Sequence, residues 1–563
     1  MDVSAFITYR DIFGREIDEE TLRDDARALS LSDCLQSLGK LSHLLAADEA
    51  AQANSLMFGG LRYPGAVMLT EAMLRVGRPL VFGKRLLAAA RVAVLDAQER
   101  DPDCFDEQHD LYRFVRLILG VTDVYAEADA PNGVGPDEQR DWFCSLILKR
   151  VGLPQRRFYS AVVRSVRVFV DLPKRRPELL HVDPPSVAFE REVGLTLERY
   201  LAICFAVVVR FYGWNREPDA WLLDMGYFRD TQIAPEEFGL AAQTFAAPIS
   251  AIRSQIRTEV DAGYDSIDDI WPFITNPLIQ IDDGVYLTLD VETLGDALVG
   301  DGLYWRMKYN PRATQSERES LGEALGHLVE AHCFEAAEPV FAAADPAAVL
   351  FPEVRYRKVV DDERRRLDGP DAAIFEGAAA AFVEIGIDRP NVLETIVRGE
   401  LTSFDRDVEE ILLPRADQLN RKINDFLAAD LIYDGIALKT IARLHPVICL
   451  IDGFPAIGPL YDRVVERFAR EGYFAQPIVG AVSIISVEEF EYLCGLVERG
   501  ERFTAILRDH AHSPMGRETL RDYLLKRLGH SPDPPTHLQT EFREIGDRFA
   551  RQLFGKTLPA VDQ

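Results

Sequence analysis

Apolar residues in the first half of the chain recur mostly at the spacing of an α-helix. Over residues 21–257, leucine, valine and alanine repeat every three or four positions, as Leu31, Leu35 and Leu38 do. Runs rich in proline and glycine separate these blocks. The longest apolar run, Tyr200–Val209, has ten residues, about half of what a bilayer span requires. We therefore expect this run to form a buried helix.

The helical pattern predicts an all-helical domain over residues 1–265, and the pattern changes in a connector over residues 266–312. Pro277–Ile281 and Val285–Leu289 are β-prone and flank the turn-forming sequence Asp282-Asp283-Gly284. Two short apolar runs around a turn that ends in glycine are typical of a β-hairpin. The connector is therefore expected to contain a hairpin and a short helix.

Residues 313–500 alternate between helical and β-prone segments. We expect, in chain order, a helix at Glu317–Ala342, strands at Val354–Val359, Ala372–Phe375 and Ala379–Ile387, a helix at Asp405–Leu427 that Pro414 kinks or divides, a strand at Pro446–Ile451, a helix at Leu460–Glu471, a strand at Pro477–Ile485 and a helix that opens at Ser486. Alternation of this kind predicts an α/β layer structure. Residues 501–563 return to helical spacing and are expected to form a helical tail.

Composition places the chain among ordinary globular proteins, with 47% hydrophobic and 27% charged residues. The first fifteen residues mix acids, bases and aromatics and lack the pattern of a secretion signal. The seven cysteines are scattered, and none has the Cys-x-x-Cys spacing of a zinc or redox pair. We therefore expect reduced cysteines, a cytoplasmic location and no membrane association.

One basic segment departs from the net charge of −28. Lys149–Arg176 contains nine lysines and arginines and a single acid, Asp171. A cationic helical face with aromatic residues suits nucleic-acid phosphates and bases. The alternative is that these cations pair with acids elsewhere in this acidic protein or on a partner. The candidate nucleic-acid-binding residues are Arg156, Arg157, Tyr159, Arg164, Arg167 and Lys174.

Two carboxylates in the α/β region are candidates for chemistry. Asp371 follows Pro370 at the entry to a predicted strand, and Glu384 is the one charged residue within Ala378–Ile387. A carboxylate in an apolar strand is costly unless it is paired or bound to a metal. Carboxylates on adjacent strands provide the oxygen ligands that Mg²⁺ prefers. The alternative is that Asp371 is a turn residue and that Glu384 lies on an exposed face of its strand.

The order of these residues resembles the PD-(D/E)XK nuclease superfamily over about 30% of the chain, residues 322–493. The matching positions are Gly326 and Glu330 on the first helix, Pro370-Asp371 and Glu384-Ile385-Gly386 on the strands, and Gln418 on the following helix. The resemblance implies a restriction-endonuclease-like α/β core. It further implies that Asp371 and Glu384 bind Mg²⁺ or Mn²⁺, and that Glu330 and Gln418 orient water or the metal shell.

The function that the resemblance implies is that of a nuclease-like protein of bacterial restriction or antiphage-defence type, acting on DNA or RNA. The family's motif lysine is replaced by Gly386, and glycine cannot contact the attacking water or the phosphate. Lys358, Arg415, Arg421 and Lys422 are the cations that could take its place. If none does, the implied protein is a catalytically degenerate scaffold or a partner-binding subunit of a defence complex.

Overall fold

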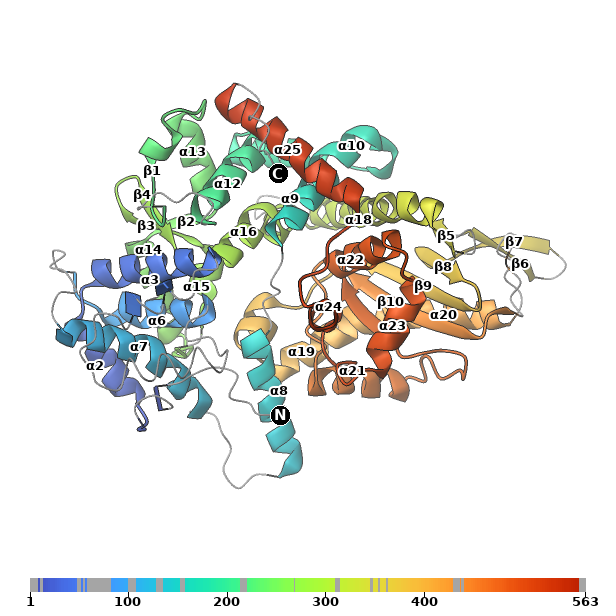
Figure 1. Ribbon diagram of the computed structural model, residues 1–563, viewed down its shortest axis with the longest axis horizontal. Coiled ribbons are helices and arrows are strands. Elements are labelled where there is room, and N and C mark those ends of the chain that lie inside the picture. Colours follow the sequence, from blue (N-terminus) through green and yellow to red (C-terminus); the bar gives the residue numbers. More distant parts are fainter. Residues whose placement is uncertain are drawn as a thin grey trace. The chain divides into compact units, whose positions relative to one another are not determined.

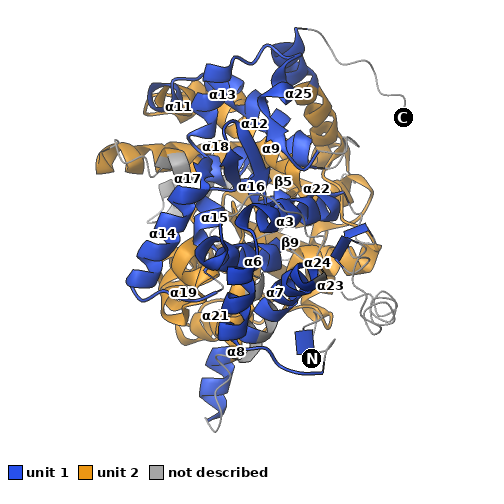
Figure 2. Ribbon diagram, turned by 90° about the vertical axis from the view of Figure 1, so that its left-hand side faces the viewer, with its two compact units in different colours: residues 1–142, 189–303, 547–563 blue, residues 143–188, 304–546 orange. Residues whose placement is uncertain are grey.

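The computed structural model describes residues 9–10, 14–47, 52–53, 56–57, 83–99, 108–127, 135–151, 157–212, 220–267, 269–308, 314–344, 348–352, 355–360, 363–428, 436 and 440–555. This part of the chain is mostly helical and contains mixed β-sheets. The chain divides into two compact units (Figure 2). Unit 1 comprises residues 1–142, 189–303 and 547–563, and unit 2 comprises residues 143–188 and 304–546.

Both units are discontinuous in sequence, which differs from the consecutive domains expected over residues 1–265, 266–312, 313–500 and 501–563. Residues 143–188 were expected in the helical domain but belong to unit 2. Most of the expected tail, up to residue 546, also belongs to unit 2. The physical reason is that helical periodicity shows which face of a segment is buried, but not which element buries it. The hydrophobic pattern of the sequence therefore does not show to which unit a helical segment belongs.

Unit 1 consists of helices around a small sheet. Its helices are α2 (Glu19–Ala28), α3 (Leu31–Ala46), α6 (Gly83–Asp96), α7 (Gln108–Glu127), α12 (Leu197–Phe211), η3 (Met225–Phe228), α13 (Pro235–Ala242), α14 (Ile249–Asp261), α15 (Trp271–Thr275) and α16 (Val291–Val299). Ser30 caps α3 by accepting a hydrogen bond from the Asp33 amide. Leu31, Leu35 and Leu38 of α3 are all buried, as their spacing predicts.

The sheet of unit 1 has the strand order β1-β4-β3-β2, with β1 at Leu223–Asp224, β2 at Ala246–Pro248, β3 at Leu278–Asp282 and β4 at Val285–Thr288. The predicted hairpin is confirmed as β3 and β4, and Gly284 in its turn has a φ of 67°. The expectation of a purely helical N-terminal domain needs correction, because β1 and β2 lie within it. Strands of two and three residues are too short to show a two-residue alternation.

Unit 2 contains the predicted α/β region. Its elements are α9 (Phe158–Val166), η1 (Arg167–Asp171), α10 (Leu172–Arg175), η2 (Pro177–Leu179), α18 (Gln315–Ala343), β5 (Ala348–Pro352), β6 (Arg355–Val360), β7 (Glu363–Asp368), β8 (Ala372–Glu376), β9 (Ala379–Gly386), η4 (Val392–Val397), α19 (Leu401–Asp407), η5 (Val408–Leu412), α20 (Leu413–Leu427), β10 (Arg443–Leu450), α21 (Pro459–Arg470), β11 (Ser483–Ser486), α22 (Val487–Glu498), α23 (Phe503–His512) and α24 (Leu520–Leu528). Helices α8 (Pro136–Val151), α11 (Pro185–Val193), α17 (Asp301–Lys308) and α25 (Thr536–Phe554) each cross a boundary between the units.

A five-stranded sheet with the order β11-β10-β9-β8-β5 forms the centre of unit 2 (Figure 1). Strands β5, β8 and β9 pair antiparallel, whereas β9, β10 and β11 pair parallel. Phe382 and Leu450 belong to a core cluster that they share with residues of α20 and α21. Cys449 points to the opposite face, where it meets Cys333 of α18. The sheet therefore lies between α20 and α21 on one face and α18 on the other.

Several predicted elements of this region are confirmed. Strands β8, β9 and β10 lie where apolar runs were identified, and Ser486 and Glu489 form the predicted capping box at the start of α22. The predicted long helix is continuous through α19, η5 and α20, and Pro414 lies in the first turn of α20, directly after the π-helical turn η5. Strand β7 was not predicted, because arginines at 364–366 interrupt any apolar pattern.

Candidate functional site

Antiparallel pairing of β8 and β9 brings Asp371 and Glu384 together. Ala372 pairs with Val383 in the register, so Asp371 lies opposite Glu384. The Asp371 Oδ2 atom accepts a hydrogen bond from the Ile385 amide at 2.7 Å. Glu384 is only 2% exposed and lies on the face of the sheet that α20 covers. The two carboxylates identified in the sequence therefore form one site.

Lys422 supplies a cation to this site from α20. Its Nζ atom donates to Glu384 Oε1 at 3.1 Å and to Oε2 at 2.9 Å, and the lysine side chain is itself buried. Among the other cations considered, Arg421 is exposed and pairs with Asp417 at 3.0 Å. The side chain of Lys358 lies outside the described residues. Of the three candidates whose side chains the structure describes, Lys422 is the one that contacts Glu384 directly.

Arg415 occupies the space beside Gly386. A methyl group at position 386 would overlap the guanidinium of Arg415. The guanidinium donates from Nη1 to the Ile385 carbonyl at 3.1 Å and from Nη2 to Asp388. The absence of a side chain at Gly386 therefore allows α20 to be attached to the end of β9 through Arg415.

The electrostatics of the site raise the pKa of Glu384 to about 7. Burial is the main cause and the charge of Asp371 adds to it, while Lys422 and Arg415 oppose the rise. A carboxyl group with such a pKa exchanges its proton near neutral pH. This property is typical of catalytic groups, although buried structural ion pairs produce it too.

The two remaining residues of the resemblance lie on different helices. Gln418 is half-buried on α20, four residues before Lys422 and hence on the same side of that helix. Glu330 belongs to α18, which covers the opposite face of the sheet, and its Oε2 atom lies 3.7 Å from Nδ1 of His327. The geometry thus associates Gln418 with Lys422, whereas Glu330 belongs to a helix on the other side of the sheet.

A metal ion at this site would have few protein ligands. Within the part of the chain that the structure describes, no group of three or more His, Cys, Asp or Glu residues is arranged to hold a metal ion. Asp371 and Glu384 alone fit the mode in which Mg²⁺ uses one or two carboxylates and completes its shell with water and substrate phosphate. They do not form a preassembled site of the kind that binds zinc or calcium.

The arginines at the centre of the basic segment are paired with internal carboxylates. Arg164 and Arg167 are each only 5% exposed. Arg164 lies 3.3 Å from Glu491, and Arg167 lies 2.8 Å from Glu335 and 3.4 Å from Glu541. For these two arginines the structure favours the alternative of internal acids over a phosphate-binding face.

The other residues of this segment have different environments. Arg157 donates from Nη1 to the hydroxyl of Tyr159 at 2.6 Å and to Asp533 at 3.0 Å. Lys174 is exposed on α10. Arg156 lies outside the described residues. A phosphate-binding role therefore stays a prediction that depends mainly on Lys174 and on the exposed parts of Arg157 and Tyr159.

A buried polar cluster in unit 2 was not identified from the sequence. His332 Nε2 lies 2.8 Å from Glu491, which also pairs with Arg164, and all three side chains are buried. Burial lowers the pKa of His332, so its ring is neutral near pH 7. Although burial alone would raise the pKa of Glu491, Arg164 and His332 hold it below its ordinary value. The three residues come from α9, α18 and α22 and connect these helices in the interior.

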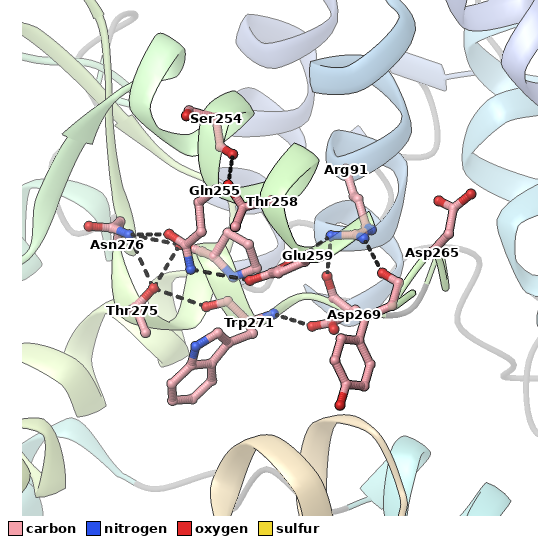
Figure 3. Close-up of polar contacts among 12 residues, drawn as sticks. Arg91, Ser254, Gln255, Thr258, Glu259, Asp265, Asp269, Trp271, Thr275 and Asn276 are labelled. Atoms are coloured by element: carbon pink, nitrogen blue, oxygen red, sulfur yellow. Dashed lines mark hydrogen bonds and ion pairs between the residues drawn. The ribbon is translucent and has the colours of Figure 1, made fainter. Parts of the chain in front are cut away.

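Unit 1 contains a comparable structural cluster (Figure 3). Arg91 of α6 is 1% exposed and donates to the backbone carbonyls of Asp269 and Tyr264 at 3.0 and 3.1 Å. It also pairs with Glu259 of α14 at 3.3 Å. Burial and the charge of Asp269 raise the pKa of Glu259. These contacts attach the loop between α14 and α15 to α6 and suggest no chemistry.

Comparison with known proteins identifies no relative. The chain matches no protein-family model, no curated protein and no solved structure. None of the helices in the described ranges has the length and apolar character needed to cross a membrane. The function must therefore be inferred from the site itself.

Proposed function

We propose that this protein is a nuclease-like protein that hydrolyses phosphodiester bonds of DNA or RNA with a divalent cation held at Asp371 and Glu384. The observation that carries the proposal is the contact of Lys422 with both carboxylate oxygens of Glu384. It provides, from α20, the cation that Gly386 cannot provide from β9. The chain order of α18, three sheet strands, α20 and β10 further supports the resemblance to the PD-(D/E)XK superfamily.

Asp371 and Glu384 would hold Mg²⁺ or Mn²⁺ through carboxylate oxygens. When bound, the ion would lower the pKa of a coordinated water and neutralise charge on the scissile phosphate. The Ile385 amide holds Asp371 in place, since it donates to Oδ2. Because the pKa of Glu384 is near 7, this carboxyl can release its proton to become a ligand at little cost.

Lys422 would act on the substrate rather than on the metal. In the structure its ammonium group neutralises Glu384. If a metal ion bound to Glu384, the ion would neutralise the carboxylate instead, and the ammonium could donate to a phosphate oxygen or to the attacking water. Gln418, one helical turn earlier on the same side of α20, would orient that water. Arg415 would position the site indirectly, because it fixes the start of α20 to the Ile385 carbonyl.

A cleavage assay tests the proposal. The full chain is incubated with supercoiled, linear and single-stranded DNA and with RNA, in Mg²⁺ or Mn²⁺ and in EDTA. We expect metal-dependent cleavage that falls by roughly 100-fold or more in Asp371→Asn, Glu384→Gln and Lys422→Met. Arg421→Met, an exposed neighbour on the same helix, is the matched control and should cleave normally. Cleavage that persists in Asp371→Asn and Glu384→Gln would overturn the assignment.

A catalytically degenerate scaffold is the second candidate, and one observation favours it. The buried Lys422–Glu384 pair already neutralises the site without a metal ion. Under this alternative the protein binds nucleic acid or a partner protein of a bacterial restriction or antiphage-defence complex, but does not cleave. Calorimetric titration with Mn²⁺ separates the two, because the nuclease proposal requires metal binding that Asp371→Asn abolishes.

A further inference from the structure

A cavity of about 330 Å³ lies beside α10 in unit 2. It is lined by five charged residues, Arg167, Asp171, Lys174, Arg175 and Glu541. The first two belong to η1, the next two to α10 and the last to α25, and α10 packs against α18 (Figure 1). The volume is at the lower end of the range found for small-molecule sites in proteins. We call this space the α10 cavity.

Arg167 is the buried cation of the α10 cavity, and its guanidinium is only partly satisfied. Its Nη2 atom donates to Glu335 at 2.8 Å. Its Nε atom lies 3.4 Å from Oε1 of Glu541, but within the described residues neither Nε nor Nη1 has a hydrogen-bond partner. An arginine side chain can only donate, and buried donors normally have acceptors. A ligand in the α10 cavity that carries acceptor oxygens would satisfy these donors.

The positive and negative charges around the α10 cavity are equal in number. Three cations and two carboxylates line it. Glu335 provides a third carboxylate, because it pairs with Arg167 and with Arg175 at 2.8 Å each. A phosphate dianion would add an excess of negative charge to this group, whereas a ligand with one charge of each sign preserves the balance.

Glu541 is the carboxylate of the α10 cavity that lacks sufficient positive charge. Burial raises its pKa, and although Arg167 and Arg175 oppose the rise, Asp171 and Glu335 add to it. A raised pKa means that the ionised carboxylate is less well stabilised here than in water. A ligand ammonium group beside Glu541 would supply the missing cation.

We propose that the α10 cavity binds a small zwitterion, namely a free α-amino acid. The ligand carboxylate accepts hydrogen bonds from Arg167 and Lys174, and the ligand ammonium donates to Asp171 and Glu541. The wall sets the separation of the two ligand charges, since the Arg167 guanidinium and the Glu541 carboxylate are 3.4 Å apart. Opposite charges that close together match the carboxylate and ammonium that an α-amino acid carries on one carbon atom.

This site is separate from the proposed nuclease site. Glu335 belongs to α18, which covers the face of the sheet opposite α20, and neither Asp371 nor Glu384 lines the α10 cavity. The amino-acid proposal therefore does not rest on the nuclease proposal. A chain that fails to cleave nucleic acid can still bind an amino acid here.

Thermal-shift screening followed by calorimetric titration tests the proposal on the full chain. The common α-amino acids are screened at millimolar concentration, and we expect at least one to raise the thermal midpoint and to bind saturably. Binding should weaken by about tenfold or more in Glu541→Gln and in Lys174→Gln, because each removes a charge that contacts the ligand. Arg176→Gln changes an exposed neighbour that pairs with Glu178, and this control should bind as the unmodified chain does. Binding by no amino acid, or equal binding by the two variants and the control, would overturn the proposal.

Arg167→Lys tests the buried donors. Lysine keeps a positive charge beside Glu335 but cannot present the planar array of donors that arginine has. We expect weaker binding in a protein whose thermal midpoint without ligand shows that it is folded. If this variant does not fold, Lys174→Gln on the exposed helix α10 tests the same carboxylate contact. Amino-acid binding that a folded Arg167→Lys variant retains in full would contradict the site.

Two analogues of the bound amino acid test whether both of its charges are recognised. The N-acetyl derivative lacks the ammonium and the amide lacks the carboxylate, and we expect each to bind about tenfold or more weakly than the amino acid. In Glu541→Gln, acetylation should cost less affinity than in the unmodified chain, because the partner of the ammonium is already removed. Inorganic phosphate, a purely anionic probe, should not compete. Competition by phosphate, or an N-acetyl derivative that binds as tightly as the amino acid, would refute recognition of a zwitterion.

Discussion

Lys422→Met is the substitution that most directly tests the electrostatics of the candidate site. Methionine keeps the apolar stem of the lysine and removes its charge, so packing changes little. Glu384 then remains buried without its partner. Its pKa in the folded protein already lies at about 7, against an ordinary value of 4.5, even with Lys422 present. A folded-state pKa above the unfolded value means that this carboxyl destabilises the fold as the pH rises from 4.5 through 7.

The size of the effect follows from these two values. Each pKa unit corresponds to about 1.4 kcal/mol, so ionised Glu384 costs the original protein about 3 kcal/mol at pH 8.5. Without Lys422, the free-energy cost of burying ionised Glu384 is larger. It cannot exceed the cost of protonating the carboxyl, which at pH 8.5 is about 5 kcal/mol, because above that limit the carboxyl takes up a proton. Lys422→Met should therefore lower the free energy of unfolding by up to about 2 kcal/mol at pH 8.5. At pH 5.5 Glu384 is protonated in both proteins, and the difference should approach zero.

Urea unfolding followed by circular dichroism at the two pH values measures this difference. Arg421→Met is the control, because its exposed pair with Asp417 should contribute less than about 0.5 kcal/mol at either pH. The double variant Glu384→Gln/Lys422→Met should show no pH dependence from this pair. A loss of stability in Lys422→Met that is equal at pH 5.5 and pH 8.5 would refute the reasoning, since it would show that Glu384 does not titrate in this range.

Three other substitutions test contacts in unit 2. Gly386→Ala should lower the calorimetric thermal midpoint, because the added methyl displaces the Arg415 guanidinium from its hydrogen bonds at a cost of about 1–2 kcal/mol. In an Arg415→Ala background, the same substitution should cost no further stability. Glu491→Gln removes the carboxylate that pairs with the buried Arg164 and should cost about 3–5 kcal/mol in urea unfolding. Glu376→Ala removes the acceptor of two backbone amides at the start of α23 and should speed hydrogen exchange there. Unchanged stability or exchange in any of these variants would contradict the corresponding contact.

Local patterns were sufficient to predict the elements that hold the two carboxylates. Strands β8 and β9 are short apolar runs, and their antiparallel pairing places Asp371 opposite Glu384. Strand β5 was missed although it is an apolar run of the same length as β8, and the side chains that the structure describes in it are only half-buried. Strand β7 was missed because its three consecutive arginines interrupt any apolar pattern. Apolar runs therefore identified the strands that are buried along most of their length, and they overlooked a half-buried strand and a highly charged one.

The partners of charged residues could not be predicted from the sequence. Lys149–Arg176 shows cations at helical spacing, but the glutamates that neutralise Arg164 and Arg167 come from α18, α22 and α25, more than 150 residues later. A cationic helix face has the same pattern whether it meets phosphate or an internal carboxylate.

Gly386 and Lys422 have a common geometric basis. The guanidinium of Arg415 fills the space that a side chain at position 386 would need, and it fixes the start of α20 to the Ile385 carbonyl. Two helical turns later, α20 delivers Lys422 to Glu384. A lysine placed at 386 would displace Arg415 and disturb the helix that supplies the present cation. Glycine at 386 therefore permits the position of α20 that brings Lys422 to Glu384. The positive charge of the site comes from α20 rather than from β9.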